Sequence, residues 1–146
     1  MSASTVIPGT AGAAAMVARD RASAALGMRV VEAEPGHAVV AMVIREDMLN
    51  GFDVAHGAFV FAVADTAFAI ACNETDAVTL AAGAEISFLR PGILGRTLVA
   101  TADRRSRGGR SGIYDVQVVD GTGVIAEFRG RSRVTSRSVP GAAPTE

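Results

Sequence analysis

The stretch GAFVFAVADTAFAIAC, residues 57–72, decides the fold of this chain. It contains good helix formers and no proline, and apolar side chains fall on every side of the helical wheel. A helix that is apolar all round is buried in its protein. We therefore predict one long central helix, over about 57–73, that the rest of the chain encloses.

Strand-like patterns lie on both sides of this helix. The runs RVVEA and HAVVAMVI flank the turn signal Glu34-Pro35-Gly36 and predict a hairpin over residues 29–44. Four more strands, separated by glycine-containing turns, are predicted at about 77–89, 96–105, 110–119 and 123–135. This α+β pattern requires the antiparallel sheet to bury one face against something long and apolar. A sheet wrapped around the central helix is the hotdog fold, which is the architecture we predict.

The length of 146 residues indicates a single domain. Residues 1–26 join an aperiodic arm to an Ala-rich stretch and predict a frayed N-terminus followed by a short helix. The domain itself is expected over residues 27–135. The last segment, SRSVPGAAPTE at 136–146, predicts a disordered tail.

The charge of the chain argues against nucleic acid or a membrane as a partner. The formal net charge is -1, and no stretch reaches the roughly 18 apolar residues that a membrane span needs. No basic region precedes the apolar residues at the N-terminus, so we expect a soluble, cytoplasmic protein. All 14 basic residues are Arg, which excludes lysine Schiff-base chemistry and favours bidentate contacts with phosphate.

Asp65 is the only ionisable carboxylate in the central helix. Burying an ionised carboxylate is costly unless it is paired, so a lone Asp at this position needs a reason. One interpretation is a catalytic carboxylate at a cleft or an interface. The alternative is a structural Asp that caps a break near Ala64 or is hydrogen-bonded by Thr66. Cys72, in the same helix, is interpreted as a structural thiol rather than a nucleophile.

The dipeptide His56-Gly57 stands where the helix is expected to begin. The first N–H groups of a helix lack internal partners and carry the positive end of its dipole, so Gly57 could serve as an oxyanion hole. Alternatively, Gly57 only relieves crowding between helix and sheet. Asn50-Gly51 is interpreted first as a tight turn, and His56 as a histidine that orients the loop rather than a general base.

The segment LNGFDVAHGAFVFAVADTAFAIACN, residues 49–73, closely resembles the signature of the PaaI-type hotdog thioesterases, the phenylacetic acid degradation family. The resemblance continues through ISFLRPGILG, RSGIYDVQVVD and FRGRS and covers about residues 15–135. It implies hydrolysis of an aryl-acyl or related CoA thioester, without metal or organic cofactor, by a homotetramer of two hotdog dimers. By matching position, it implies that Asp65 is the catalytic acidic residue, that Gly57 N–H polarises the carbonyl, and that Asn50 and His56 flank the attacked group.

Two positions depart from the family pattern. Where the family often has a small hydroxyl residue after the central helix, this chain has Ala81-Ala82-Gly83, which puts a hydrogen bond to the water or carboxylate in doubt. The second glycine of the family's common HGG is Ala58, a conservative change inside a helix.

The spacing of Gly57 and Asp65 predicts a site shared by two chains. Eight residues span about 12 Å along a helix, whereas both groups must come within roughly 3–3.5 Å of one carbonyl. Antiparallel helices in a homodimer would bring Gly57 of one chain to Asp65 of the other. Asp65 would then either attack the thioester or deprotonate a water held near Asn50, and the sequence leaves both open.

The remaining site residues are predicted by type and place. Basic side chains that could hold the CoA phosphates are Arg90, Arg104, Arg105, Arg107 and Arg110, with a solvated hairpin as the equal alternative. Aromatic side chains expected to line the acyl pocket with loop 48–55, unless they belong to the core, are Phe59, Phe61 and Phe68.

Two rival functions are considered. A hotdog hydratase is disfavoured because no closely spaced Asp and His with an Asn-Pro precede the helix. A non-catalytic acyl-CoA-binding module, such as the sensor part of a regulator, is disfavoured by the intact Asp65 and by the roughly 26 residues before the first strand, too few for a DNA-binding domain.

Overall fold

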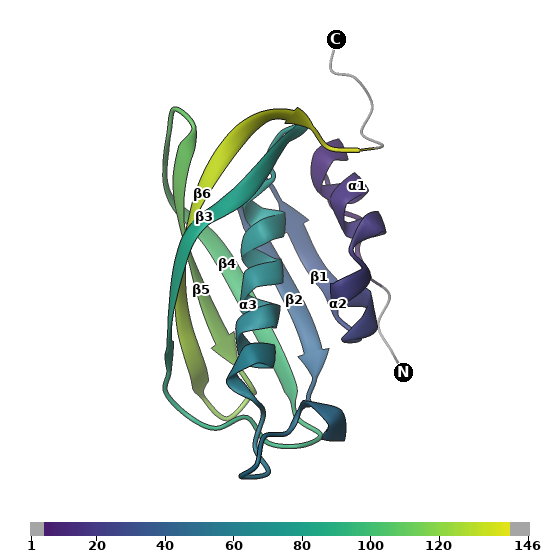
Figure 1. Ribbon diagram of the computed structural model, residues 1–146, viewed down its shortest axis with the longest axis vertical. Helices are drawn as coiled ribbons and strands as arrows, with labels where there is room; N and C mark the ends of the chain where they lie inside the picture. Colours follow the sequence, from purple (N-terminus) through teal and green to yellow (C-terminus); the bar gives the residue numbers. More distant parts are fainter. Residues whose placement is uncertain (1–4, 141–146) are drawn as a thin grey trace.

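A computed structural model describes residues 5–140 as a six-stranded antiparallel sheet curved around one long helix (Figure 1). The strand order is β1-β2-β4-β5-β6-β3. The helices are α1 (Ala11–Arg19), α2 (Arg21–Ala25) and α3 (Gly57–Cys72), with a short 3-10 turn at Glu46–Met48. The strands are β1 (Arg29–Glu34), β2 (His37–Val43), β3 (Ala77–Phe88), β4 (Thr97–Gly108), β5 (Ser111–Val119) and β6 (Val124–Ser138). The predicted hotdog fold is confirmed.

The central helix α3 occupies residues 57–72, as predicted, and side chains fix both of its ends. At the start, His56 Nδ1 accepts a hydrogen bond from the Ala58 N–H at 3.0 Å. At the end, the buried Asn73 donates its side-chain amide to the Ala69 carbonyl at 2.7 Å. The Asn73 side chain also accepts the Thr79 N–H at 3.1 Å, so it joins the end of the helix to β3.

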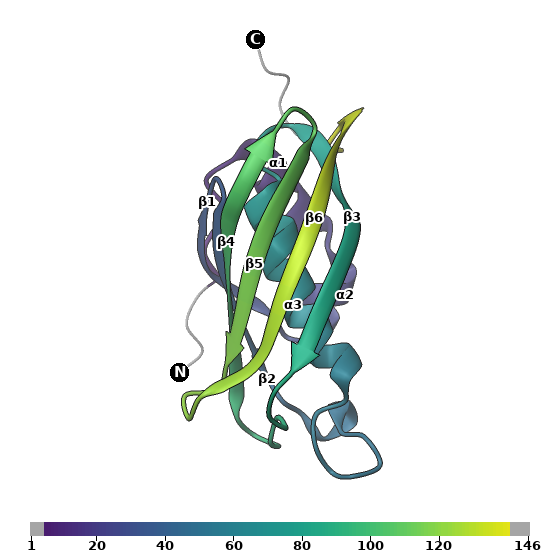
Figure 2. The same cartoon turned by 90° about the vertical axis from the view of Figure 1, so that its left-hand side faces the viewer.

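The core lies between α3 and the concave face of the sheet. The helix packs mainly on β2, β4 and β5, whose inward side chains are small and aliphatic, such as Val40, Ala100 and Val116. These small residues let the strands approach the helix closely. Seen from the outer face, β3, β4, β5 and β6 lie in front of most of α3, and the N-terminal end of the helix extends beyond them (Figure 2).

The sheet covers only part of the helix, contrary to the expectation that α3 is buried on all sides. The buried residues of α3 are Val60, Val63, Ala64, Ala67, Phe68, Ile70, Ala71 and Cys72. A second stripe, which we call the open stripe, is exposed or only half-buried in the chain and consists of Ala58, Phe61, Ala62, Asp65 and Ala69. The spacing of these residues places them along one face of the helix. The lone carboxylate of α3 therefore lies on the face that its own sheet leaves open.

Next to the open stripe, β3 forms one edge of the sheet and pairs only with β6. Large apolar side chains at both ends of β3 are exposed, with 51% of Leu80 and 53% of Phe88 accessible. An edge strand with exposed apolar side chains is a template for pairing with another chain.

The ends of the chain correct two sequence-based predictions. The single N-terminal helix is divided at Asp20, which ends α1 and caps α2. The disordered tail was predicted to begin at residue 136, which is too early. Strand β6 continues to Ser138, and the buried Val139 donates its N–H to the Asp76 carbonyl at 2.8 Å. The rest of the predicted tail, 141–146, and the first four residues of the arm lie outside the described residues.

A buried carboxylate holds the end of α3 against the sheet. The Glu74 side chain is only 3% exposed, and it accepts hydrogen bonds from the Tyr114 hydroxyl and from Arg104, both at 2.6 Å. Arg107 lies 3.8 Å from the same carboxylate. Burial and the Glu74 charge raise the pKa of Tyr114, which keeps it a hydrogen-bond donor. Glu74 therefore fastens the helix end to β4 and β5.

Replacing Glu74 by Ala is expected to lower the free energy of unfolding by about 1–3 kcal/mol, because the Tyr114 hydroxyl loses its buried acceptor. Urea unfolding measures the change. Glu127→Ala is the matched control, since Glu127 is exposed and bonds only the exposed Gln117, and it should stay within about 0.5 kcal/mol of wild type. Equal losses in the two variants would contradict this role for Glu74.

Candidate active site

A cleft of about 340 Å³ opens at the N-terminal end of α3. The loop before the helix forms one wall and the segment after β3 forms the other. Its lining residues are Asn50, Val54, Ala55, Gly57, Val60, Phe88, Leu89, Arg90, Pro91 and Gly92. Three of the predicted site residues, Asn50, Gly57 and Arg90, thus meet in one cleft.

Gly57 is the first residue of α3, and its N–H makes no hydrogen bond within residues 5–140. A donor at a helix N-terminus carries the positive end of the dipole. The ring of Phe88 lies across this glycine, and a Cβ at position 57 would come within 3.1 Å of it. Glycine therefore satisfies the packing against Phe88 and leaves the N–H accessible to an oxygen in the cleft. The contact with Phe88 supports the crowding interpretation of Gly57, and its role as an oxyanion donor stays a prediction.

The loop side chains Asn50 and His56 both accept hydrogen bonds from backbone N–H groups. Asn50 Oδ1 accepts the N–H groups of Phe52 at 2.8 Å and Val54 at 3.4 Å, as the tight-turn interpretation expects. Its Nδ2 makes no hydrogen bond within the described residues, and the residue lines the cleft as a donor. Because His56 Nδ1 accepts the Ala58 N–H, the proton of the neutral ring lies on Nε2.

Asp65 lies two turns beyond Gly57 on the open stripe and is half-buried. Its carboxylate makes no hydrogen bond to any part of the chain that the structure describes. Burial raises the pKa of this carboxyl, and the nearby charge of Asp20 raises it further. Asp65 is absent from the lining of the cleft, as the rise of about 1.5 Å per helical residue requires. One chain therefore supplies two separated halves of the predicted constellation.

At Ala81-Ala82-Gly83, where the family often has a hydroxyl side chain, the neighbouring β6 leaves little room for one at position 83. Ala81 and Ala82 are exposed on the edge strand, and the Arg131 guanidinium of β6 lies over Gly83. A Cβ at Gly83 would collide with that guanidinium. A serine or threonine at position 83 would therefore displace Arg131.

The predicted CoA-binding arginines divide into two groups. Arg90 lines the cleft and donates to the Thr122 carbonyl and hydroxyl, both at 3.2 Å. The others lie on or next to the β4–β5 turn, at the opposite end of α3 from the cleft (Figure 1). There, Arg104 and Arg107 face Glu74, and Arg105 pairs with Asp115 at 2.8 Å. Arg110, at the turn, is exposed and forms no ion pair within residues 5–140.

None of the predicted acyl-pocket phenylalanines lines the cleft. Phe68 is 1% exposed, and its ring packs against Tyr114 at 5.6 Å between centroids, which makes it a core residue. Phe61 packs against Phe128 at 5.3 Å, and Phe59 lies 6.2 Å from the His56 ring. The aromatic wall of the cleft is Phe88, which the sequence interpretation missed. Its place next to Arg90-Pro91-Gly92, at the end of a predicted strand, is the signal that was available.

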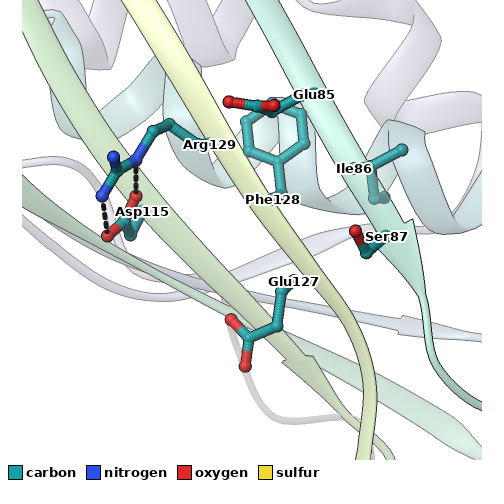
Figure 3. A pocket seen from close by; sticks show the side chains of 7 residues that line it. All are labelled: Glu85, Ile86, Ser87, Asp115, Glu127, Phe128 and Arg129. Atoms are coloured by element: carbon teal, nitrogen blue, oxygen red, sulfur yellow. Dashed lines mark hydrogen bonds and ion pairs between the residues drawn. The ribbon is translucent and has the colours of Figure 1, made fainter.

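A second depression, of about 310 Å³, lies on the outer face of the sheet (Figure 3). Here Arg129 donates two hydrogen bonds to Asp115, of 2.6 and 2.9 Å. The side chains of Glu85, Ser87 and Glu127 lie around this pair (Figure 3). Arg129 and then Arg105 hold the pKa of Asp115 below its usual range. Asp115 is thus engaged by cations on both sides.

Residues 5–140 contain neither a candidate membrane span nor a candidate metal site. None of the described helices is long and apolar enough to cross a membrane. Within the same residues, His, Cys, Asp and Glu side chains do not gather in groups of three or more that could hold a metal ion.

Comparison with known proteins identifies the family. Residues 52–127, which include Gly57 and Asp65, match the thioesterase superfamily. The acyl-coenzyme A thioesterase PaaI of Escherichia coli K12 is 41% identical over 130 residues, which are 88% of this chain and 93% of that protein. The structure of E. coli PaaI, from the phenylacetic acid degradation operon, superposes with a TM-score of 0.84 and covers 87% of this chain and 93% of that one.

A structure of a variant of the phenylacetic acid degradation protein PaaI from Thermus thermophilus gives the same result at greater distance. It is 34% identical and superposes with a TM-score of 0.76, and the match covers 80% of this chain and 100% of that chain. The residues that match the thioesterase superfamily, 52–127, include the whole of α3 and every residue that lines the cleft except Asn50. The chain therefore belongs to the thioesterase superfamily.

Proposed function

We propose that this protein hydrolyses acyl-CoA thioesters to a free acid and CoA, with phenylacetyl or a ring-hydroxylated aryl-acyl group as the preferred acyl part. The observation that carries the proposal is the pair of unsatisfied groups on α3: the free Gly57 N–H in the cleft and the half-buried, unpartnered Asp65 carboxylate. The first is suited to an oxyanion, and the second to an attacking group or a base. The similarity to E. coli PaaI, an acyl-coenzyme A thioesterase, supports the substrate class.

The two groups act together only if a second copy of the chain completes the site. The open stripe on α3 and the exposed edge strand β3 are neighbouring surfaces that a second chain would cover. If two α3 helices face one another antiparallel about a two-fold axis, Gly57 of one protomer comes opposite Asp65 of its partner. This arrangement gives two equivalent sites per homodimer. A tetramer of two such dimers is the assembly that we propose for the active protein.

In this site the thioester carbonyl oxygen receives the Gly57 N–H, and the dipole of α3 stabilises the charge that develops on it. Asn50 Nδ2 and His56 Nε2 are the nearby side-chain donors, the first on the cleft wall and the second at the helix start. Asp65 of the partner either attacks the carbonyl carbon, giving a mixed anhydride that water then hydrolyses to the free acid, or removes a proton from a water that attacks the carbonyl carbon. In both routes the C–S bond breaks and CoA leaves as the thiol.

The CoA phosphates are assigned first to Arg90, which stands at the cleft beside Phe88. Arg110 is the second choice, because it is exposed and forms no ion pair within the described chain. Arg104, Arg105 and Arg107 already neutralise carboxylates, so they add less net positive charge for a phosphate.

Asp65→Asn is expected to keep the fold and to lower kcat by at least about a hundredfold, because it keeps the side-chain shape and removes the base or nucleophile. Release of free thiol is measured with phenylacetyl-, hydroxyphenylacetyl-, benzoyl- and straight-chain acyl-CoAs, and circular dichroism checks the fold. Wild-type turnover in the variant would overturn the role of Asp65. Negligible hydrolysis of every thioester by the wild type would instead favour a binding module.

The shared site makes a quantitative prediction. Asp65→Ala and Asn50→Ala chains, mixed unfolded in equal amounts and refolded, should form half heterodimers, in which one site carries both defects and the other carries neither. Random pairing then restores about a quarter of wild-type activity from two nearly inactive parents. Native mass spectrometry establishes that heterodimers have formed. Heterodimers with only parental activity would exclude the shared site.

Arg90→Ala is expected to raise KM for CoA thioesters about twofold to fivefold with little change in kcat, as for one exposed charge contact remote from the carbonyl. The difference should shrink at high salt. Arg105→Ala is the matched control, because Arg105 pairs with Asp115 on the outer face of the sheet. A rise in KM for Arg105→Ala but not for Arg90→Ala would place the phosphates on the outer face.

A further inference from the structure

The junction between the two N-terminal helices places a carboxylate next to the central helix. Asp20 caps α2: its Oδ1 accepts the Ser23 N–H at 2.9 Å and its Oδ2 accepts the Ser23 hydroxyl at 2.6 Å. Its side chain therefore points into the angle between α1, α2 and α3, where it lines a cavity of about 190 Å³ together with Ser23 and Thr66.

A hydroxyl relay connects this carboxylate to α3. Ser23 Oγ lies 2.8 Å from Thr66 Oγ1. An ionised Asp20 can only accept, so Ser23 uses its single proton on Asp20 and must accept from Thr66. The direction of the chain is thus Thr66 to Ser23 to Asp20, and Thr66 is the residue that follows Asp65. The relay holds the Asp20 charge at a fixed position beside the turn of α3 that carries Asp65.

Two carboxylates, Asp20 and Asp65, thus lie beside the same turn of α3, and neither forms an ion pair within residues 5–140. Burial is the main cause that raises the pKa of the Asp65 carboxyl, and the charge of Asp20 adds to it. Arg19 and Arg21, which flank Asp20 in the sequence, form no ion pair with either carboxylate within residues 5–140. From α3 itself, Cys72 interacts with Asp65, but burial raises its pKa to about 12, so it stays a neutral thiol. The strands that pack on α3 present apolar residues to it, and the charged residues of β6 near the helix, Glu127, Arg129, Arg131 and Arg133, are exposed.

The cavity next to Asp20 gives its charge few polar neighbours. The remaining walls of the cavity are mostly apolar and include Val17, Met28, Val30, Val40 and Ile70. Charges interact more strongly next to apolar walls than in water. A repulsion that several specific hydrogen bonds maintain, rather than relieve, indicates a functional use.

We propose that Asp20, fixed against the central helix by Ser23 and Thr66, is a positioning residue of the thioesterase reaction, and that its negative charge makes Asp65 accept a proton from water rather than attack the thioester. This inference rests on the proposed function of Asp65. In the step, the water oxygen bonds to the carbonyl carbon while one water proton passes to the Asp65 carboxylate. Collapse of the intermediate breaks the C–S bond, and the same proton passes to the departing sulfur.

The test is the pH profile of kcat/KM for Asp20→Asn. Asn is as good a helix cap as Asp, so the variant keeps the bond to the Ser23 N–H. It removes the charge, and it replaces the oxygen that accepts the Ser23 hydroxyl by an amide donor. Asp65 works in its ionised form, so activity rises with pH through its pKa. Removal of the repelling charge lowers that pKa, and the acidic limb of the profile should move to lower pH. The plateau should fall, because the weaker base transfers the proton less readily, but by much less than the roughly hundredfold loss of Asp65→Asn.

Matched variants separate this role from a structural one. Glu34→Gln removes an exposed carboxylate of β1 and should leave the limb in place. Thr66→Val should shift the limb in the same direction as Asp20→Asn, and Thr66→Ser should restore it. An unmoved limb in Asp20→Asn, or a loss of thermal stability in Thr66→Val with an unchanged profile, would overturn the proposal. Wild-type turnover in Asp65→Asn would instead reject the proposed function on which it rests.

Discussion

A long apolar helix has to be covered along its whole circumference, and one curved sheet covers only part of it. In this protein β2, β4 and β5 bury the side of α3 that carries Val63, Ala67 and Phe68. The N-terminal helix α2 packs on another part of α3. What remains is the open stripe, with Asp65 in the middle and the edge strand β3 alongside. Most functional properties inferred for this thioesterase follow from that incomplete cover.

The incomplete cover explains how a carboxylate can occupy an otherwise apolar helix. Fully buried, an ionised Asp65 would need a cation or several donors, and it has none within the described chain. On the open stripe the carboxylate is only half-buried, so it remains ionisable while its pKa is raised. A second chain laid over the stripe would enclose the carboxylate with substrate, and Gly57 of that chain would supply the N–H that α3 cannot present to its own Asp65.

Charges elsewhere in the protein are arranged differently. Glu74 and Asp115 each meet arginines at hydrogen-bond distance, and these pairs fasten the helix end to the sheet or cross-link neighbouring strands. Asp20 and Asp65 stand out against this pattern, since the relay through Ser23 and Thr66 keeps like charges together. An arginine-rich chain with no lysine thus pairs Glu74 and Asp115 with cations and leaves Asp65, the carboxylate proposed to be catalytic, without an ion pair within residues 5–140.

The sequence by itself determined the elements and their order. The signals were local: uniform apolarity over residues 57–72, β-branched runs, and turns that contain glycine. The central helix and the six strands lie where these signals are, although some strands extend further, as β6 does to Ser138. It also singled out Asp65 and Gly57, because a lone charge in an apolar helix and a glycine at its start are visible in the linear chain. Only the tertiary structure decided which residues share a cleft, because Phe88 and Arg90 reach Gly57 through the folding of β3 beside the helix. It also decided that Phe68 is a core residue, that Arg104 pairs with Glu74 and that Ser23 connects Asp20 to Thr66 of α3. These are contacts between residues distant in sequence, and they depend on three-dimensional packing and pairing that no local pattern encodes.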